Sequence, residues 1–458
     1  MGNPRWMSKL STPRAALFSI LLCGGLYGDA LAQQSQEPPA YTVIRTGWLF
    51  DSESAQLIPQ QTILVSARTI HAVGRNVEVP QGARVIDLSS YTVLPGLIDA
   101  HTHLLSAIAV PETADDEVMR RIYDVASVGT PLRALRGAAR ARSYLRSGIT
   151  TVRDLGDAGW YGDVALKRAI NEGTVEGPRM LVSGPGLATG TGQFGLLQQP
   201  FAGIAQEEFS IVRGPGEAAA AVRDHLGMGA DLIKIYPMPL EFVLSVTQEV
   251  RQLRATPFLR SLTVAAHATV DAQAWRAATA GVHSIEHGYS IADSTLALMA
   301  RQRIFLVPTD PPDTTFRRHY LSRNRRVSQP EVTGHELLAE LGGRRDRLRR
   351  AIAAGVRIAF GSDNYWDYGV PAGEVAIAVL LGYAEAGMPP AQILQSATAN
   401  AAELLGLEGS IGVIRPGASA DIIAIDGNPV RDIYSLRRAV FVMKEGTVYV
   451  TPSGIRSR

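Results

Sequence analysis

The hydrophobic pattern at both ends of the chain predicts short β-strands. Residues 41–93, 420–427 and 439–450 hold β-branched and apolar residues that partly alternate with polar ones, and Gly, Pro and Asn separate the runs. Such runs are typical of strands joined by tight turns. Because short strands need a sheet to join, we expect the two chain ends to build one small β-sandwich together.

Between the ends, short apolar runs alternate with longer helical stretches that are rich in Ala, Arg and Leu. The eight runs are GLIDAHTH (96–103), ITTVRDLG (149–156), RMLVSG (179–184), LIKIY (232–236), LTVAAHA (262–268), SIEHG (284–288), IFLVPT (304–309) and RIAFGSD (357–363). This number of strand–helix units is typical of a closed parallel barrel. The sequence therefore predicts an α/β fold, a TIM (β/α)8 barrel with a small β-sandwich domain built from both chain ends.

The N-terminus has the pattern of a secretory signal peptide. Basic residues precede a short apolar stretch at 15–26, and residues 30–32 match a small-x-small cleavage site. The apolar stretch is too short to span a bilayer comfortably, so we expect cleavage rather than a retained anchor. The mature protein should then be secreted or periplasmic, without stable membrane insertion.

The chain of 458 residues is long enough for one large domain and a smaller one. The predicted parts are a signal peptide at 1–32, the first part of the sandwich at 33–94, the barrel at 95–411 and the second part of the sandwich at 412–458.

Loss of the signal peptide changes the net charge of the protein. The whole chain has a formal net charge of +2, and residues 1–32 carry all of this excess. The mature chain is formally neutral, so no global field favours nucleic acid as a partner. The single cysteine, Cys23, leaves as well, which excludes disulfide and thiolate chemistry.

Two histidines end the first apolar run of the predicted barrel, at the edge where such barrels carry their active sites. Side chains alternate along a strand, so His101 and His103 point the same way, about 6.5 Å apart along the backbone. Two imidazoles placed in this way can chelate one metal ion. Alone, the pair indicates little, because histidines at the end of a strand also occur as hydrogen-bonded core residues.

Polar residues also end other runs of the predicted barrel. His267 and His287 close the fifth and sixth runs, and Asp363 closes the eighth. Four histidines at three strand ends are hard to explain as independent packing accidents. A carboxylate at the end of a buried strand is costly unless it meets a cation or donors, and a metal ion supplies that cation.

Lys234 lies inside the apolar run LIKIY. It either pairs with a carboxylate or reacts with CO₂ to form a carbamate, whose two oxygens can bridge two metal ions. A dry site beside cations favours the neutral amine that reacts with CO₂. Two close divalent ions would share a hydroxide and polarise a substrate carbonyl, and Asp363 could pass the proton to a leaving amine.

These residues and their surroundings resemble the amidohydrolase superfamily, in its binuclear branch with a carboxylated lysine. The matching blocks, in the family's order and over nearly the whole mature chain, are PGLIDAHTHL (95–104), GITTVRDLG (148–156), GADLIKIY (229–236), AGVHSIEHG (280–288), IAFGSDN (358–364) and GSIGVIRPGASADIIAIDGNP (409–429). Within that superfamily the sequence is most similar to exported Xaa-Pro and other dipeptidases, ochratoxin-type amidases and imidazolonepropionase-like proteins.

The resemblance implies an exported hydrolase that cleaves an amide or peptide C–N bond, in a dipeptide, an N-acyl amino acid or a similar compound, by a metal-bridging hydroxide. Asp363 would be the general base and acid. The implied metal ligands are His101, His103 and Asp363 for the first ion, His267 and His287 for the second, and carboxylated Lys234 between them. Zinc is the expected ion, because imidazole dominates the ligand set.

Four residues are predicted to contact substrate. Tyr236 follows Lys234 on the same side of its strand and can bond a substrate carboxylate or the oxyanion, or else is a rim tyrosine. Gln193, in TGTGQFG, and Thr269, in HAT, stand where the family often has histidines, so the substrates of known relatives do not transfer directly. Arg153 either binds a carboxylate or forms an ion pair with Asp154.

Residues 316–350 are rich in arginine and predict either a solvated helix and loop or a basic wall that attracts an anionic substrate. The expected partner is a small molecule or a short peptide, and assembly into a homo-oligomer stays open.

The sequence leaves two other functions open. One is a mononuclear hydrolase or deaminase of a cyclic C–N bond, like imidazolonepropionase, or a lactonase; the other is a non-catalytic binding protein. Lys234 and the signal peptide favour the amide hydrolase.

Overall fold

The computed structural model describes residues 41–110, 114–156, 159–195, 197–315, 317 and 334–452. Ala40–Arg458 form one compact unit. The predicted signal peptide, residues 1–32, lies outside the described residues. Among the helices that are described, none combines the length and the apolar character needed to cross a bilayer.

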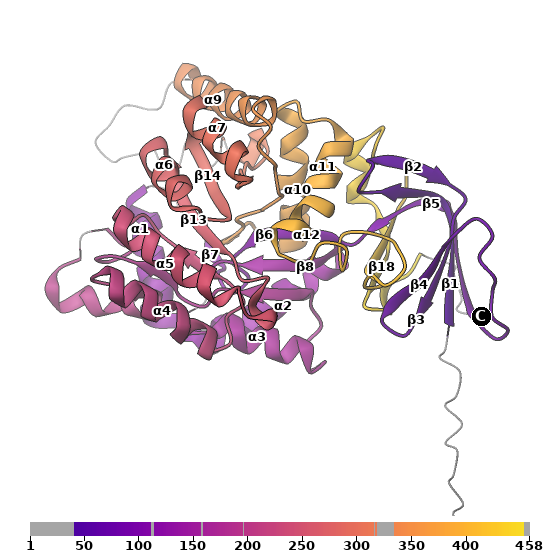
Figure 1. The fold of residues 1–458 in the computed structure, drawn as a ribbon, viewed down its shortest axis with the longest axis horizontal. Coiled ribbons are helices and arrows are strands. Elements are labelled where there is room, and N and C mark those ends of the chain that lie inside the picture. Colours follow the sequence, from indigo (N-terminus) through magenta and orange to yellow (C-terminus); the bar gives the residue numbers. More distant parts are fainter. Residues whose placement is uncertain are drawn as a thin grey trace, which may run out of the picture. The chain divides into compact units, whose positions relative to one another are not determined.

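Strands from both ends of the chain form a single sheet, as the sequence predicts for the chain ends. The strand order is β19-β18-β17-β5-β1-β3-β4, and β2 pairs with β1 (Figure 1). The pairing of β5 with β17 is antiparallel and joins the N-terminal strands to the C-terminal ones. The strands are β1 (Tyr41–Asp51), β2 (Gln56–Pro59), β3 (Thr62–Ser66), β4 (Thr69–Gly74), β5 (Arg84–Pro95), β17 (Ile422–Ile425), β18 (Ala439–Lys444) and β19 (Thr447–Val450).

This sheet curls around its own core, whereas the sequence predicted a sandwich of two sheets. Ile70 of β4 and Phe441 of β18 belong to the same buried cluster, although their strands lie near opposite ends of the hydrogen-bonded order. The Ile70 N–H donates to Ala418 O at 2.8 Å, which connects β4 to the segment before β17. The prediction of a sandwich is therefore corrected to one sheet. The parallel pairing of β1 with β5 joins its two parts, so the hydrogen bonding between strands is continuous.

The middle of the chain forms two parallel sheets, of order β6-β8-β9 and β11-β10-β12-β13-β14-β15. Their strands are β6 (Leu97–Thr102), β8 (Ile149–Asp154), β9 (Arg179–Val182), β10 (Gly186–Ala188), β11 (Phe209–Ile211), β12 (Ile233–Ile235), β13 (Val264–Val270), β14 (Ser284–Ser290) and β15 (Phe305–Val307). Seven of the eight predicted runs therefore contain a strand.

Backbone hydrogen bonds connect the two parallel sheets on both sides. On one side, the Asp231 N–H before β12 donates to Val182 O at the end of β9, at 2.8 Å. On the other side, Leu306 of β15 forms an isolated parallel bridge with Ile358. The Ala100 N–H of β6 then donates to Phe360 O at 2.8 Å, so the segment around Ile358 lies between β15 and β6.

The eighth predicted strand, residues 357–363, is only this isolated bridge. Its Phe360 N–H donates outside the sheet, to Ser396 O at 2.8 Å. Further along, Asp363 adopts a left-handed conformation with φ of 49°. Both features interrupt the ladder that a regular strand requires, and both turn the chain toward the site described below.

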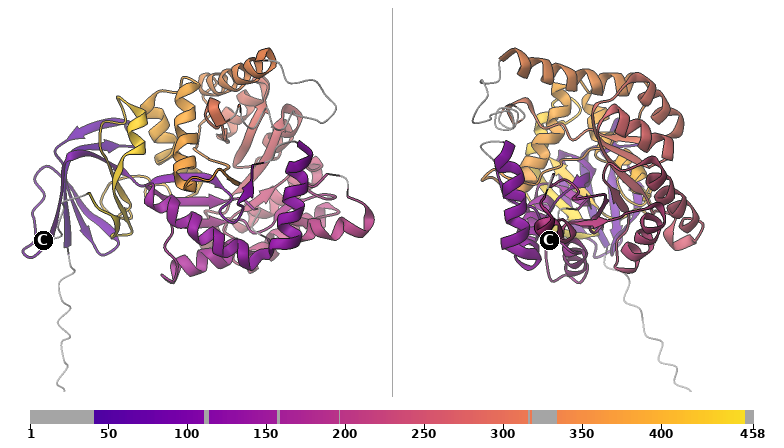
Figure 2. Two further views of the ribbon diagram at one scale, coloured as in Figure 1. Left: turned by 180° about the vertical axis from the view of Figure 1, so that it is seen from behind. Right: turned by 90° about the vertical axis from the view of Figure 1, so that its left-hand side faces the viewer.

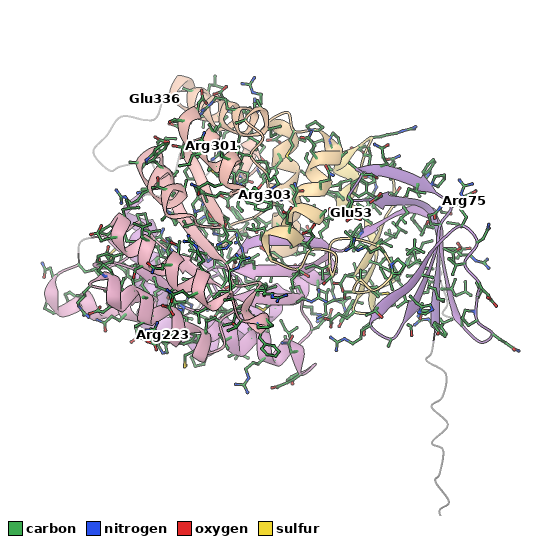
Figure 3. The ribbon with its side chains drawn as sticks, in the orientation of Figure 1. Glu53, Arg75, Arg223, Arg301, Arg303 and Glu336 are labelled. Carbon is green, nitrogen blue, oxygen red and sulfur yellow. The ribbon has the colours of Figure 1, made fainter. Side chains whose placement is uncertain are left out.

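Helices lie around the parallel strands in the two further views (Figure 2). Gly281 ends α6 (Asp271–Ala280) in the left-handed conformation, which glycine adopts without steric strain. Charged side chains such as Arg75, Arg223 and Arg301 are exposed on the outside of the fold (Figure 3). The longer helices are α1 (Ala114–Tyr123), α2 (Gly129–Arg146), α3 (Gly162–Asn171), α4 (Pro215–Gly227), α5 (Leu240–Leu253), α6 (Asp271–Ala280), α7 (Asp293–Gln302), α9 (Gly334–Ala353) and α10 (Ala372–Glu385).

Short elements complete the fold, and the sequence did not predict most of them. They are β7 (Ile108–Ala109), β16 (Trp366–Asp367), α11 (Pro390–Ser396), α12 (Ala399–Leu404), a π-helical stretch (Asp124–Val128) and 3₁₀ helices at Gln199–Glu207, Pro257–Leu259 and Ile433–Arg437.

Candidate active site

The residues predicted to bind metal meet in one cavity of about 180 Å³, which we call the metal cavity. They come from the carboxyl-terminal ends of parallel strands or from the turns just beyond, so residues far apart in sequence become neighbours. Its lining includes all six of them: His101, His103, Lys234, His267, His287 and Asp363.

His101 and His103 both aim Nε2 at Asp363. The Nε2 atoms lie 3.4 Å and 3.1 Å, respectively, from Asp363 Oδ1. On the other side of each ring, Nδ1 of His101 lies 2.7 Å from Glu286 Oε2, and Nδ1 of His103 lies 2.8 Å from Gly156 O. Because these oxygens accept hydrogen bonds, Nδ1 carries the proton and Nε2 keeps its lone pair for a metal ion.

His267 and His287 form a second pair. Nδ1 of His267 lies 3.0 Å from Nε2 of His287, and Nδ1 of His287 lies 2.8 Å from Thr309 Oγ1. Two nitrogen ligands of a tetrahedral zinc ion lie about 3.3 Å apart, so this spacing is compatible with one shared ion. Donor atoms of His101, His287 and Asp363 also lie within 4.8 Å of one another.

The donor set fits divalent cations. Lone pairs of two imidazoles and a carboxylate oxygen face one another at 3.4 Å or less. Such groups repel one another unless a proton or a cation lies between them. Imidazole nitrogens and a carboxylate are ligands that zinc accepts, and neutral histidine is the form that binds it.

Burial sets the protonation states that metal binding needs. Burial, reinforced by the Lys234 charge, lowers the pKa of His101 to about 4 and that of His267 to about 3. Burial opposes ionisation of Asp363, but the neighbouring histidines, His101 first, hold its pKa well below its usual range. At neutral pH the imidazoles of His101 and His267 are therefore neutral and the carboxylate of Asp363 is ionised.

Two of the predicted ligands hold an unusual backbone conformation. His287 has φ of 74° and Asp363 has φ of 49°, and Thr309, which contacts His287, has φ of 54°. Residues other than glycine rarely adopt such values, and strain of this kind clusters at functional sites. The packed strand ends hold these side chains in place against the local preference of the chain.

Lys234 is 1% exposed and lies in β12. Its Nζ lies 5.4 Å from the centre of the Tyr236 ring, which also lines the metal cavity. Gly186 makes this arrangement possible, because a Cβ at that position would lie 2.4 Å from the Tyr236 ring. The lysine thus lies in the cavity wall among the predicted ligands.

Arg153 is fully buried and is not among the described residues that line the metal cavity. Its Nη2 donates to Glu286 Oε1 at 2.8 Å, and its Nε donates to Ala100 O at 2.5 Å. The ion pair therefore joins Arg153 to Glu286 rather than to Asp154, as one alternative had expected. Burial opposes ionisation of Glu286, but Arg153 and His101 lower its pKa to about 2.

Sequence reasoning missed Glu286, although it directly precedes His287. Strict alternation along β14 would point the two side chains to opposite faces. The left-handed conformation of His287 breaks that alternation, and Glu286 reaches His101 from behind the cavity. A carboxylate beside a ligand histidine was the signal that could have found it.

Gln193 and Tyr236 both line the metal cavity, as expected for residues that contact substrate. Gln193 Oε1 accepts a hydrogen bond from Arg121 Nη2 at 3.1 Å. Arg121, in α1, also lines the cavity and was not predicted. Thr269 lines the same cavity, so several polar side chains surround the predicted ligands.

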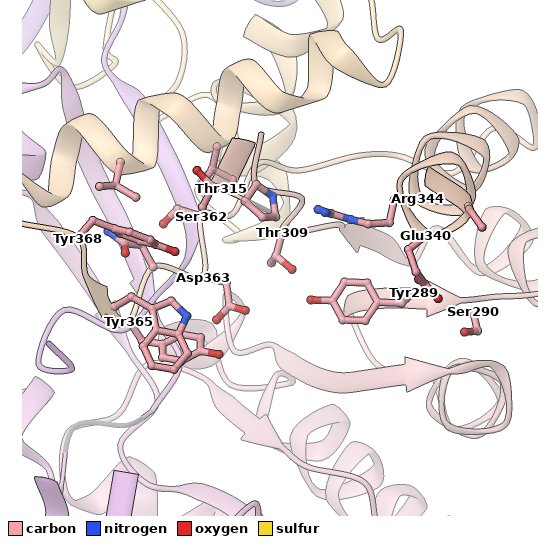
Figure 4. A pocket seen from close by; sticks show the side chains of 17 residues that line it. Tyr289, Ser290, Thr309, Thr315, Glu340, Arg344, Ser362, Asp363, Tyr365 and Tyr368 are labelled. Atoms are coloured by element: carbon pink, nitrogen blue, oxygen red, sulfur yellow. The ribbon is translucent and has the colours of Figure 1, made fainter. Parts of the chain in front are cut away.

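A larger cavity of about 560 Å³, the side cavity, adjoins the metal cavity. The two share Tyr289, Asp363 and Tyr365 in their walls, and Figure 4 shows the Asp363 carboxylate between the rings of these tyrosines. Arg344, from the arginine-rich segment, also lines the side cavity.

The arginine-rich segment matches neither prediction fully. Arg344 and Arg347 in α9 are buried, not solvated. Both pair with the buried carboxylate of Asp310, Arg344 through Nε at 2.9 Å and Nη2 at 2.8 Å. They therefore offer no uncompensated basic wall to an anionic substrate. Residues 318–333 of the segment lie outside the described residues.

Comparisons with known proteins agree with this geometry. The sequence pattern of the Amidohydrolase family matches residues 92–452. Ochratoxinase of Aspergillus niger is 28% identical over 441 residues, which cover 87% of this chain and 84% of that protein. Imidazolonepropionase of Symbiobacterium thermophilum is 26% identical over 439 residues, which cover 89% and 94%, respectively.

A crystal structure of a Xaa-Pro dipeptidase with methionine bound in its active site is similar in fold. Its TM-score is 0.73 at 29% identity, and the match covers 90% of this chain and all of that one.

Proposed function

This chain belongs to the amidohydrolase family and is a hydrolase that acts on C–N bonds, and we propose that it uses two divalent metal ions to cleave an amide or peptide bond. Its substrate is a dipeptide, an N-acyl amino acid or a similar compound. The names of the related ochratoxinase and Xaa-Pro dipeptidase support this substrate class.

One observation carries the proposal. Nε2 of His101 and Nε2 of His103 converge on Asp363, while His267 and His287 face each other across the same cavity. In the proposed assignment, His101, His103 and Asp363 hold one ion, and His267 and His287 hold the other. Zinc suits these ligands.

Lys234 is proposed as the bridge between the ions, as a carbamate formed with CO₂. Its place in the wall of the metal cavity, 1% exposed, supports this role. A carbamate would bring an anion with two oxygens to a site rich in neutral imidazoles, and so would offset the charge of two cations.

Bound divalent ions supply a water of lowered pKa and polarise the substrate carbonyl. The chain's own residues do the rest. Asp363, ionised at neutral pH, accepts a proton from the attacking water and returns it to the leaving nitrogen. Glu286 and the Gly156 carbonyl keep His101 and His103 in the orientation and tautomer that the site needs.

We further propose that the parallel strands form a closed (β/α)8 barrel over residues 95–411. The hydrogen bonds that connect the two parallel sheets on both sides support closure. Residues 33–94 and 412–458 are assigned to the smaller β-domain, of which 33–40 and 453–458 lie outside the described residues; the pairing of β5 with β17 supports this division. A barrel places all the strand ends around one cavity, where the six proposed ligands lie.

Metal analysis of the purified protein tests the function. About two ions per chain support the binuclear amide hydrolase. About one ion favours the alternative that the imidazolonepropionase relative suggests, a hydrolase or deaminase of a cyclic C–N bond. No bound metal would contradict the proposed use of two metal ions. A panel of dipeptides, N-acyl amino acids and lactones then separates amide hydrolysis from lactonase activity.

The variant Lys234→Ala tests the bridge. It should retain at most one ion per chain and lose activity by several orders of magnitude, because no group would then join the two ions. Metal content and kcat/KM are measured on the same preparation, and circular dichroism checks the fold. An active Lys234→Ala variant with two ions would contradict the carbamate.

Export is a separate proposal. It rests on the basic and apolar pattern of residues 1–32. Cleavage after Ala32 predicts a mature N-terminus at Gln33, which N-terminal sequencing of the protein from its native compartment would test. A protein that starts at Met1 and stays with the cytosolic fraction would contradict it.

A further inference from the structure

The metal cavity and the side cavity differ greatly in size. The metal cavity measures about 180 Å³ and the side cavity about 560 Å³, and they meet at Asp363 between Tyr289 and Tyr365. A volume of this size is typical of pockets that hold small organic molecules. A substrate whose scissile bond lies beside Asp363 can therefore extend into both.

About half of the residues that line the side cavity are aromatic or apolar, and hydroxyl and amide side chains such as Ser290, Thr309 and Asn364 line the rest. Tyr289, Tyr365, Trp366 and Tyr368 supply rings, and Val379 adds an apolar side chain. Figure 4 shows the rings of Tyr289 and Tyr365 on either side of the Asp363 carboxylate. Ring faces and edges of this kind favour a flat, apolar guest.

Apart from Asp363, which lies where the cavities meet, the charged residues of these walls are Arg344 and Glu340. Arg344 donates through Nε and Nη2 to Asp310, at 2.9 Å and 2.8 Å. Glu340, the other charged residue that α9 contributes to the lining, is exposed. A buried ion in the guest would lose its hydration without a counter-charge, so the cavity suits an uncharged group.

The metal cavity is small and polar away from its predicted ligands. Arg121, Gln193 and Thr269 line it beside Tyr236. Little room remains there for a large apolar group. The two cavities together thus present one small polar half and one large, more apolar half to a substrate.

Resting on the proposed amide hydrolysis, we propose that the side cavity binds a bulky, uncharged, ring-bearing group attached on one side of the scissile bond. The metal cavity then holds the small polar part on the other side. The substrate class is an amide that joins a small polar acid or amine to a ring system.

Gly343 provides a way to fill the side cavity without disturbing the fold. It lines the cavity from α9, and a Cβ at this position would meet no atom within 4 Å. Gly342 is the matched control, because it is adjacent on the same helix, has the same open space and does not line the cavity. Phenylalanine is tolerated better than glycine inside a helix, so both variants should fold.

The experiment uses the full-length, metal-loaded protein and two substrate series. One is N-acetylglycine, N-benzoylglycine and N-(2-naphthoyl)glycine; the other is glycinamide, glycine anilide and glycine 2-naphthylamide. In the wild type, kcat/KM should rise about tenfold or more from the smallest to the largest member of one series. Gly343→Phe should lower the ratio of largest to smallest about tenfold, while Gly342→Phe keeps the wild-type ratio.

Binding is measured in parallel by titration calorimetry with N-(2-naphthoyl)glycine and glycine 2-naphthylamide. Hydrolysis of all compounds at similar kcat/KM, or a ratio that Gly343→Phe leaves unchanged, would overturn the cavity assignment and leave the hydrolase function standing. Binding that Gly343→Phe weakens, without hydrolysis of any compound, would support the cavity and overturn the proposed amide hydrolysis. Should Gly343→Phe not fold, the wild-type size series alone decides.

Discussion

Glu286 holds His101 from behind the metal cavity, and Arg153 holds Glu286. The three side chains are buried and are linked by distances of 2.7 Å and 2.8 Å. An outer hydrogen bond of this kind orients a ligand histidine and strengthens it as a donor. A buried arginine and a buried glutamate thus hold one imidazole in position.

Glu286→Gln should weaken metal binding about 10- to 100-fold, because the amide keeps the shape but loses the charge that supports His101. Competition with a chelator measures the metal affinity. Glu241→Gln, at an exposed position of α5, is the control and should bind metal as the wild type does. Equal metal affinity in Glu286→Gln and the wild type would show that the contact does not position the ligand.

His283 makes the stability of the fold sensitive to acid. Burial and the adjacent Arg254 charge lower its pKa to about 3, whereas in the unfolded chain it titrates near 6.5. Between these values the unfolded state binds more protons than the folded state, so stability falls as pH falls below about 6.5. In His283→Gln, the metal-loaded protein should lose less unfolding free energy between pH 7.5 and pH 5. Urea titrations at both values measure it, and an identical loss would refute the assignment.

The sequence predicted the ligand residues better than the residues that hold those ligands in position. His101, His103, His267, His287 and Asp363 were predicted because each ends an apolar run, and the structure brings them into one cavity. Their binding of metal stays a prediction. The alternative that paired Arg153 with Asp154 was wrong, because the observed partner, Glu286, lies 133 residues away in sequence. Local spacing carries no information about such a contact.

At the level of elements, apolar runs predicted strand positions well, and helices such as α2, α4, α6 and α9 formed between them, as the alternation predicted. The run at 357–363 failed as a strand because its hydrogen bonds leave the ladder at Phe360. Elements of two to four residues, such as β7, β16 and β2, carry too few residues to show a period. The packing of one helix on another likewise depends on residues that periodicity does not single out.

Gly373 shows this for the contact between α10 and α2. A Cβ there would lie 2.4 Å from the Ser143 carbonyl oxygen of α2, so Gly373→Ala should separate the helices and cost about 1–3 kcal/mol of unfolding free energy. Gly216→Ala in α4 is the control, because its Cβ would meet open space, and it should be neutral or slightly stabilising. Urea denaturation compares the two, and equal midpoints would contradict the close approach.

At the level of the whole molecule, Arg179 ties the parallel strands to the sheet of the chain ends. From β9 it donates to Asp421 Oδ2 at 2.6 Å and to Glu445 Oε1 at 2.7 Å. The Asp421 side chain is only 2% exposed, so the arginine is its main compensation. Lys444 adds a second link, since its Nζ donates to Gly177 O at 2.7 Å.

Arg179→Met should therefore destabilise the protein by about 3–5 kcal/mol, because it leaves a buried carboxylate without its partner. Chemical denaturation at neutral pH measures the change. Arg223→Met, which removes the ion pair between an exposed arginine and the half-buried Glu249, should shift stability by less than about 1 kcal/mol. Similar effects of the two variants would mean that the link contributes little.

The pairing of β5 with β17 also determines when the small β-domain can fold. Val93 of β5 lies opposite Ala424 of β17, so the partner strand is synthesised more than 300 residues later. Until then, one edge of β5 has unpaired N–H and C=O groups, which is a template for aggregation. The small β-domain therefore cannot be completed until almost the entire chain has been synthesised. Its completion is among the last steps of folding rather than the first.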